Sequence, residues 1–96
     1  MTALKVKGAI QVLLYSALNG EVQGMVLSDG TQVRLPPDVS EEFRQSLQVG
    51  AHMVVEGYGT ENQYGRAIEA LAMSLNGGPL IPLDLTIRHL PSRKLE

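Results

Sequence analysis

The chain has 96 residues, with 8 basic and 10 acidic side chains and a formal net charge of −2. This length fits one domain with a single core of modest stability. The absence of cysteine excludes disulfides and thiolate metal sites, and the acidic balance argues against a polyanion-binding protein that depends on net charge alone.

The first predicted strand covers residues 4–15. Apolar residues recur at every second position from Val6 to Leu14, apart from Gly8, and a period of two is typical of a half-buried strand. Glycine inside such a pattern marks a bend or a bulge, which we expect at Gly8. A long strand that bends midway can serve both halves of a small barrel.

The next two predicted strands, residues 22–28 and 31–35, form a hairpin. The dipeptide Asp29-Gly30 between them is a strong signal for a two-residue type I′ turn. A turn of this length pairs Val26 with Val33 on one face, which is apolar and therefore predicted to point inward.

The opposite face of this hairpin is then predicted to point outward. It carries Gln23, Met25, Leu27, Gln32 and Arg34. Met25 and Leu27 are apolar, and exposed apolar side chains on one face usually contact something. We therefore expect these two residues to contact a protein partner, a second copy of the chain or the C-terminal tail.

A short amphipathic helix is predicted over residues 39–48. Asp38 suits the N-cap position, with Glu41 three residues later as in a capping box. Gly50 is a plausible stop. The apolar helix face carries Val39, Phe43 and Leu47, and the solvated remainder includes Arg44.

Two more strands are predicted at residues 51–58 and 66–75, joined by a polar loop over residues 59–65. The inward-facing residues are Met53, Val55 and Gly57 in the first of these strands and Ile68, Ala70 and Ala72 in the second. Residues 1–76 are thus assigned to a barrel. Residues 77–96 form a proline-containing tail that either adds an edge strand near residues 83–87 or stays partly disordered.

Three strands, a helix and two further strands in this order resemble the OB-fold, a five-stranded Greek-key β-barrel. The resemblance covers about residues 4–75 and rests on the glycine-bearing first strand, the Asp29-Gly30 hairpin and the helix that ends at Gly50. It implies an all-β protein of the small, bacterial, single-domain OB type, with its helix between the third and fourth strands. An SH3-like barrel is the alternative, against which the helix argues.

The resemblance also implies where a ligand binds, because OB domains hold oligonucleotides or oligosaccharides on the face of strands two and three and its flanking loops. The residues implied for single-stranded nucleic acid are Gln32, Arg34, Tyr58, Asn62, Tyr64 and Arg66. Arginine can pair with phosphate and tyrosine can stack on a base. The alternative is that these are ordinary solvated arginines and a tyrosine that anchors its own hairpin.

Two other functions remain open in the sequence. One is a protein-interaction or self-assembly module that uses Met25 and Leu27. The other is small-oxyanion binding, since Ser16-Ala17-Leu18-Asn19 resembles the Ser-Ala-Arg-Asn segment of molybdate-binding Mop domains, with leucine in place of arginine.

No nucleophile with its base, phosphate loop or compact metal-ligand set is present in the sequence, and His52 and His89 lack partners at metal spacing. No apolar run is long enough for a signal peptide or a membrane span. We therefore predict a cytoplasmic binding domain that is not an enzyme and has no cofactor or metal.

Overall fold

The computed structural model describes residues 2–37 and 39–83. Within these residues, strands predominate and one short helix interrupts them. The elements are β1 (Thr2–Tyr15), β2 (Val22–Leu27), β3 (Gln32–Arg34), α1 (Glu41–Gln45), β4 (His52–Asn62), β5 (Gly65–Leu75) and β6 (Ile81–Pro82).

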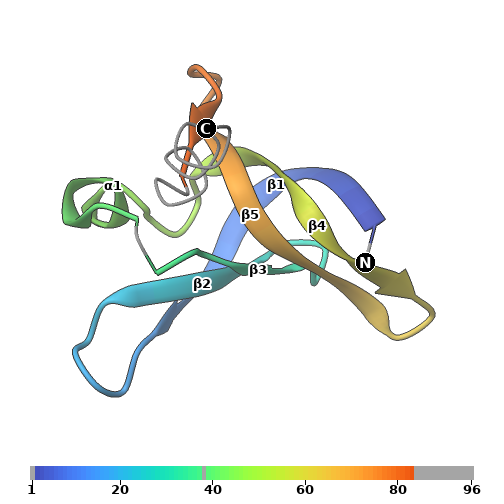
Figure 1. Cartoon of the computed structure of the whole chain (residues 1–96), viewed down its shortest axis with the longest axis horizontal. Coiled ribbons are helices and arrows are strands. Elements are labelled where there is room, and N and C mark those ends of the chain that lie inside the picture. The colour runs from blue at the N-terminus through green and yellow to red at the C-terminus, as the bar shows by residue number, and fades with distance from the viewer. Residues whose placement is uncertain (1, 38, 84–96) are drawn as a thin grey trace, which may run out of the picture.

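Strands β1 to β5 close into a mixed β-barrel (Figure 1). β1 pairs with β2 and with β4, β2 with β3, and β4 with β5, all antiparallel; the parallel pairing of β3 with β5 closes the ring. This confirms the predicted all-β class and the place of the helix between the third and fourth strands. The arrangement is compatible with an OB-like barrel.

β1 serves both halves of the barrel, as expected, because Thr2–Ala9 pairs with β4 and Ile10–Tyr15 with β2. The bulge in β1 lies at Gln11, where the register with β2 shifts, and not at Gly8. Gly8 keeps a regular pairing with β4, and a side chain added there would meet no atom closer than 3.6 Å. The strand thus bends next to the position where it changes partner, and this bend does not depend on the glycine.

The β2–β3 turn is one residue longer than predicted. The Leu27 amide donates to the Thr31 carbonyl at 2.8 Å and the Gly30 amide to the Leu27 carbonyl at 2.8 Å, with Gly30 at φ 91°. These contacts define a three-residue loop, Ser28-Asp29-Gly30, that ends in a left-handed glycine.

The longer loop shifts the strand register by one residue. Met25 now pairs with Val33, and Val26 with Gln32. Val33 keeps its predicted inward direction, so the shift of one residue turns the side chains of β2 to the other face of the sheet. Met25 and Leu27 are accordingly 0% exposed in the core, so the prediction that they form an exposed interaction surface is wrong.

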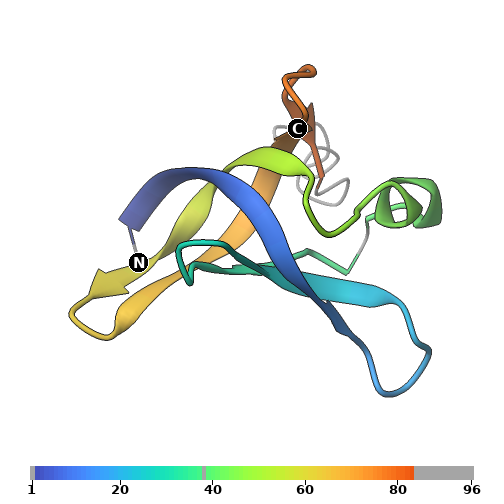
Figure 2. The same cartoon turned by 180° about the vertical axis from the view of Figure 1, so that it is seen from behind.

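The helix α1 is shorter than predicted and begins at Glu41. Its N-cap is Ser40, whose hydroxyl accepts a hydrogen bond from the Phe43 amide at 3.1 Å; Asp38, the expected N-cap, lies outside the described residues. The helix stands to the side of the strands in both views (Figures 1 and 2). Val39 and Leu47, on either side of it, are buried in the barrel core.

Arg44 is buried in the helix, contrary to the prediction of a solvated side chain. Its guanidinium donates to the carbonyl oxygens of Val22, of Val39 at 3.2 Å and of Pro37 at 3.2 Å. Carbonyls of irregular segments need donors when they are buried. Arg44 provides them and ties the helix to β2 and to the diproline segment.

β4 and β5 form a longer hairpin than predicted. Most of the expected loop over residues 59–65 is strand, and only Gln63 and Tyr64 form the turn. The predicted inward residues of β4 are buried, as are Ile68 and Ala70 of β5, whereas Ala72 is half-buried.

The predicted tail contributes a short strand, two residues earlier than expected. β6 pairs with β5 at Ala72 and Met73. Leu83 follows, its amide donating to the Leu71 carbonyl at 2.8 Å and its side chain buried in the core. Residues 84–87, the rest of the predicted edge strand, lie outside the described residues.

Candidate functional site

Strand pairing aligns five residues across one side of the barrel. Leu14 of β1 pairs with Gly24 of β2, Gly24 with Arg34 of β3, Arg34 with Glu69 of β5, and Glu69 with Tyr58 of β4. Directly paired residues share a face of the sheet. The row therefore places Arg34 at its centre and the two large exposed side chains, Leu14 and Tyr58, at its ends.

A second row runs beside the first across the same strands. It consists of Val12, Val26, Gln32, Ala67 and Thr60. Gln32 is exposed and lies two residues before Arg34 on β3, which places both side chains on one face. This row adds an amide and a hydroxyl beside the central arginine.

The first row and three residues of the second, Gln32, Ala67 and Thr60, line an open groove on the outer surface of the barrel. Its volume of ≈ 650 Å³ lies within the roughly 300–1,000 Å³ that is typical of small-ligand sites. Gly24 in the first row and Ala67 in the second have little or no side chain, which leaves the middle of the face hollow. The polar groups around the hollow are Gln23, Gln32, Arg34, Thr60 and Glu69.

The groove has nearly balanced charge. Arg34 is exposed, and no carboxylate within the described part of the chain lies within 4.0 Å of its guanidinium. Glu69 adds one negative charge in the neighbouring register position. Arg44 also lines the groove, but backbone carbonyls accept its hydrogen bonds. Arg34 is thus the cation that the groove can offer to a ligand.

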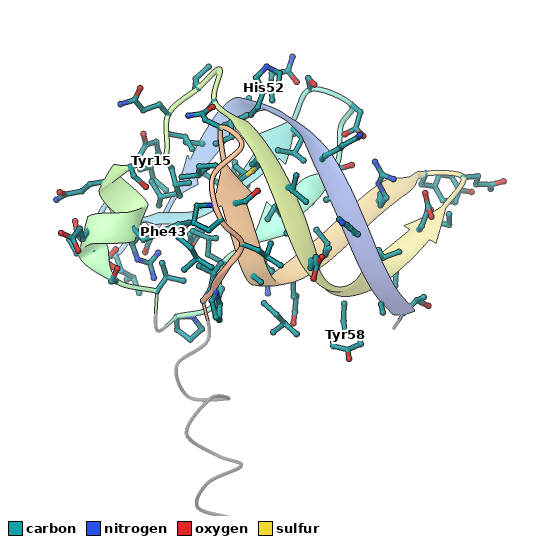
Figure 3. All side chains as sticks on the ribbon, turned by 90° about the horizontal axis from the view of Figure 1, so that it is seen from above. Tyr15, Phe43, His52 and Tyr58 are labelled. Atoms are coloured by element: carbon teal, nitrogen blue, oxygen red, sulfur yellow. The ribbon has the colours of Figure 1, made fainter. Side chains whose placement is uncertain are left out.

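Tyr58 supplies the aromatic surface of the groove. Its side chain is 50% exposed and points away from the strands (Figure 3). The residue lines both this groove and the hollow next to it, which contains Lys5. The predicted outward position of Tyr58 is therefore confirmed, and its ring is accessible to a ligand.

Arg66, a predicted phosphate ligand, makes local contacts instead. Its Nη2 lies 2.5 Å from Oδ2 of Asp29, its Nη1 lies 3.5 Å from Oε2 of Glu61, and its Nε donates to the Thr31 hydroxyl at 3.0 Å. These contacts join the start of β5 to the β2–β3 turn. A phosphate at Arg66 would have to compete with two carboxylates.

Asn62 and Tyr64 lie at the tip of the β4–β5 hairpin. Oδ1 of Asn62 accepts a hydrogen bond from the Tyr64 amide at 2.8 Å, so this side chain stabilises its own turn. Tyr64 is 88% exposed, and neither residue lines the groove. The structure therefore brings together Gln32, Arg34 and Tyr58 of the predicted set, and not Asn62, Tyr64 and Arg66.

Leu14 and Glu69 belong to the groove but were not predicted site residues. The outward direction of Glu69 could be read from alternation along its strand. That of Leu14 could not, because alternation groups Leu14 with the buried Val6 and Ile10, and the bulge at Gln11 reverses the pattern. Their position beside Arg34 could not, because it depends on the register of β1 with β2 and on the parallel pairing of β3 with β5.

The first connection uses its polar side chains within its own turn. Oδ1 of Asn19 accepts from the Glu21 amide at 3.0 Å, its Nδ2 donates to Oε1 of Glu21 at 3.3 Å, and the Ser16 hydroxyl accepts from the Leu18 amide at 3.1 Å. The adjacent Glu21 carboxylate opposes an anion here. This geometry does not favour the small-oxyanion hypothesis.

Other kinds of site find little support in the described ranges. They hold no group of three or more His, Asp or Glu side chains arranged for a metal ion, and His89 falls outside them. They also hold no helix with the length and apolar character to cross a membrane. Comparison of the chain with protein-family models, with curated proteins and with solved structures finds no match.

Proposed function

We propose that this protein is a non-enzymatic domain that binds a short segment of single-stranded nucleic acid in the groove between Leu14 and Tyr58. One observation carries the proposal: strand register places a cation, Arg34, and an exposed aromatic ring, Tyr58, in one open groove. Single-strand binders combine a positive charge for the backbone with an aromatic face for the base.

Each part of the groove has a role in this proposal. Arg34 pairs with a phosphate, and the ring of Tyr58 stacks on a base. Gln32 and Glu69 can contact base edges, since a carboxylate accepts a hydrogen bond from an amino group such as N4 of cytosine. The barrel is also compatible with the OB-like class, in which this face binds oligonucleotides.

The small charge of the groove sets the expected binding strength. For single strands, the logarithm of the affinity falls with the logarithm of salt concentration by about 0.7 for each phosphate that is neutralised. With Arg34 as the one cation in contact, a dinucleotide is expected to bind weakly and with a slope near −0.7.

The proposal is tested by NMR titration of the labelled protein with a dinucleotide at low and physiological salt. We expect amide shifts at Gln32, Arg34 and Tyr58 that weaken as salt rises. Arg34→Gln should remove most of the salt dependence, and Tyr58→Ala should cost ~1–3 kcal/mol of binding free energy through lost stacking.

The control is Tyr64→Ala, which removes an exposed tyrosine outside the groove. This variant should bind as the unmodified chain does. Equal losses for Tyr58→Ala and Tyr64→Ala would contradict the groove as the site, and the absence of shifts at low salt would contradict nucleic-acid binding.

A further inference from the structure

The surface remains hollowed beyond Tyr58. Tyr58 lines the groove and also a second hollow with Lys5 and Glu56; Lys5 and Glu56 line a third with Lys7; and Lys7 lines a fourth. Because neighbouring hollows share lining residues, they follow one another over the surface, and we call this series of hollows the furrow. It leads from Arg34 past Tyr58 and then along β4 and the first half of β1.

Two lysines follow one another along this furrow. Lys5 pairs with Glu56, and Lys7 with Val54, in a regular antiparallel ladder. Residues two apart on a strand point to the same face and are separated by about 6.7 Å. This separation is comparable to that of successive phosphates in an extended single strand.

The charges of these lysines are accessible. Lys7 forms no ion pair with any carboxylate of the described residues. Nζ of Lys5 lies 3.7 Å from Oε2 of Glu56, and the two side chains are 69% and 42% exposed. An exposed pair of this kind contributes little stability, so a phosphate can replace the carboxylate as the partner of Lys5.

Apart from the two lysines and Glu56, the residues that line the third hollow are uncharged. They are Val6, Val54, Ser74 and Leu80. An extended backbone can therefore lie along this part of the furrow with its phosphates at the lysines. The cations that the whole path can offer to a ligand are Arg34, Lys5 and Lys7, since backbone carbonyls accept the hydrogen bonds of Arg44.

We infer that the ligand is a single strand several nucleotides long, which leaves the groove at Tyr58 and follows β1 and β4 with successive phosphates at Lys5 and Lys7. This inference rests on the proposed function, and it extends the site from one phosphate contact to three. It predicts that affinity and salt dependence both increase with oligonucleotide length.

The test compares a dinucleotide with an octanucleotide of the same base, on the unmodified chain and on a Lys5→Gln/Lys7→Gln double variant. At about 0.7 per phosphate, three contacts predict a slope near −2.1 for the octanucleotide, against about −0.7 for the dinucleotide. The double variant should reduce the octanucleotide slope to about −0.7 and its affinity roughly tenfold at low salt, without changing dinucleotide binding.

A matched control separates the lysine track from net charge. Gln45→Glu with Gln48→Glu changes the charge by the same amount at exposed positions of the helix and the residues after it, and it should leave the octanucleotide slope unchanged. If the lysine variant keeps the full slope while Arg34→Gln still weakens binding, the track is refuted and the groove stands. If neither oligonucleotide binds at low salt, both proposals are refuted.

Discussion

Asp29 and Arg66 join two segments that lie 37 residues apart in the chain. The Asp29 carboxylate accepts a hydrogen bond from the Thr31 amide at 2.9 Å and pairs with Arg66. The Thr31 hydrogen bonds are the main cause of the lowering of the Asp29 pKa below its ordinary value of 3.8, and Arg66 adds to it. The ionised carboxylate thus stabilises the folded state.

The sign of the resulting pH dependence follows from linkage. A group whose pKa is lower in the folded state contributes its full stability above the unfolded pKa and loses it as pH falls through the folded pKa. We predict that the free energy of unfolding decreases as pH falls below 3.8. Asp29→Asn should lower stability at neutral pH and make this acid decline shallower, because asparagine does not titrate.

Urea unfolding at a series of pH values measures this effect. Glu42→Gln serves as the control, since it removes a carboxylate from the exposed start of the helix, and it should leave the acid decline intact. An Asp29→Asn profile parallel to that of the unmodified chain would show that this carboxylate contributes nothing to the decline.

The three arginines of the described residues could not be told apart from the sequence. Arg34 remains exposed in a groove, Arg44 is buried against carbonyls, and Arg66 pairs with carboxylates. Their sequence neighbours do not encode these differences, because each depends on segments brought near by the tertiary fold. Of the predicted environments of these three side chains, only the exposed position of Arg34 is confirmed.

At the scale of the element, the turn of the β2–β3 hairpin was predicted at the correct position, but the inward face of β2 was predicted wrongly because the loop is one residue longer than expected. The position of the turn at Asp29-Gly30 was correct. A two-residue and a three-residue loop both accept glycine at positive φ, and Met25 and Val26 are equally apolar, so the pattern could not choose between them. The one-residue difference exchanged the inner and outer faces of β2.

The β4–β5 hairpin depends on close approach of its two backbones. A Cβ added at Gly59 would overlap the Ala67 carbonyl oxygen on β5, whereas a Cβ added at Gly8 would meet nothing closer than 3.6 Å. Backbone atoms cannot move aside as a flexible side chain can. We predict that Gly59→Ala destabilises the fold by about 3 kcal/mol, at the upper end of overpacking costs.

Denaturant midpoints for Gly59→Ala and Gly8→Ala check this prediction, with equal denaturant dependence required for the comparison. Gly8→Ala should change stability by less than about 1 kcal/mol. Alanine lowers the backbone entropy of the unfolded chain, and its methyl group fits the available space in the folded state. Similar losses at both positions would indicate that a general cost of alanine in these strands, rather than the contact with β5, is responsible.

At the scale of the whole molecule, the order of strands and helix predicted the closed barrel. The order could not place residues around the barrel, because barrel closure depends on the pairing of β3 with β5, which are far apart in sequence. The residues of the predicted site therefore fall into two groups. Gln32, Arg34 and Tyr58 share the groove, whereas Asn62, Tyr64 and Arg66 lie on a long hairpin and at its tip, outside the groove.

The barrel core draws on the segment after residue 76. Leu83 is 4% exposed and belongs to the same cluster of buried residues as Val6 and Met73. A buried leucine replaced by alanine loses transfer free energy and leaves a cavity. We predict that Leu83→Ala lowers the free energy of unfolding by roughly 3 kcal/mol.

Leu80→Ala is the matched control, because the same side chain three positions earlier is 45% exposed; its cost should stay below about 1 kcal/mol. Thermal and urea unfolding of both variants provide the comparison. A large loss for Leu83→Ala within a single cooperative transition would make this segment part of the folding unit. Equal, small losses would instead place Leu83 outside the cooperative core and end that unit at β5.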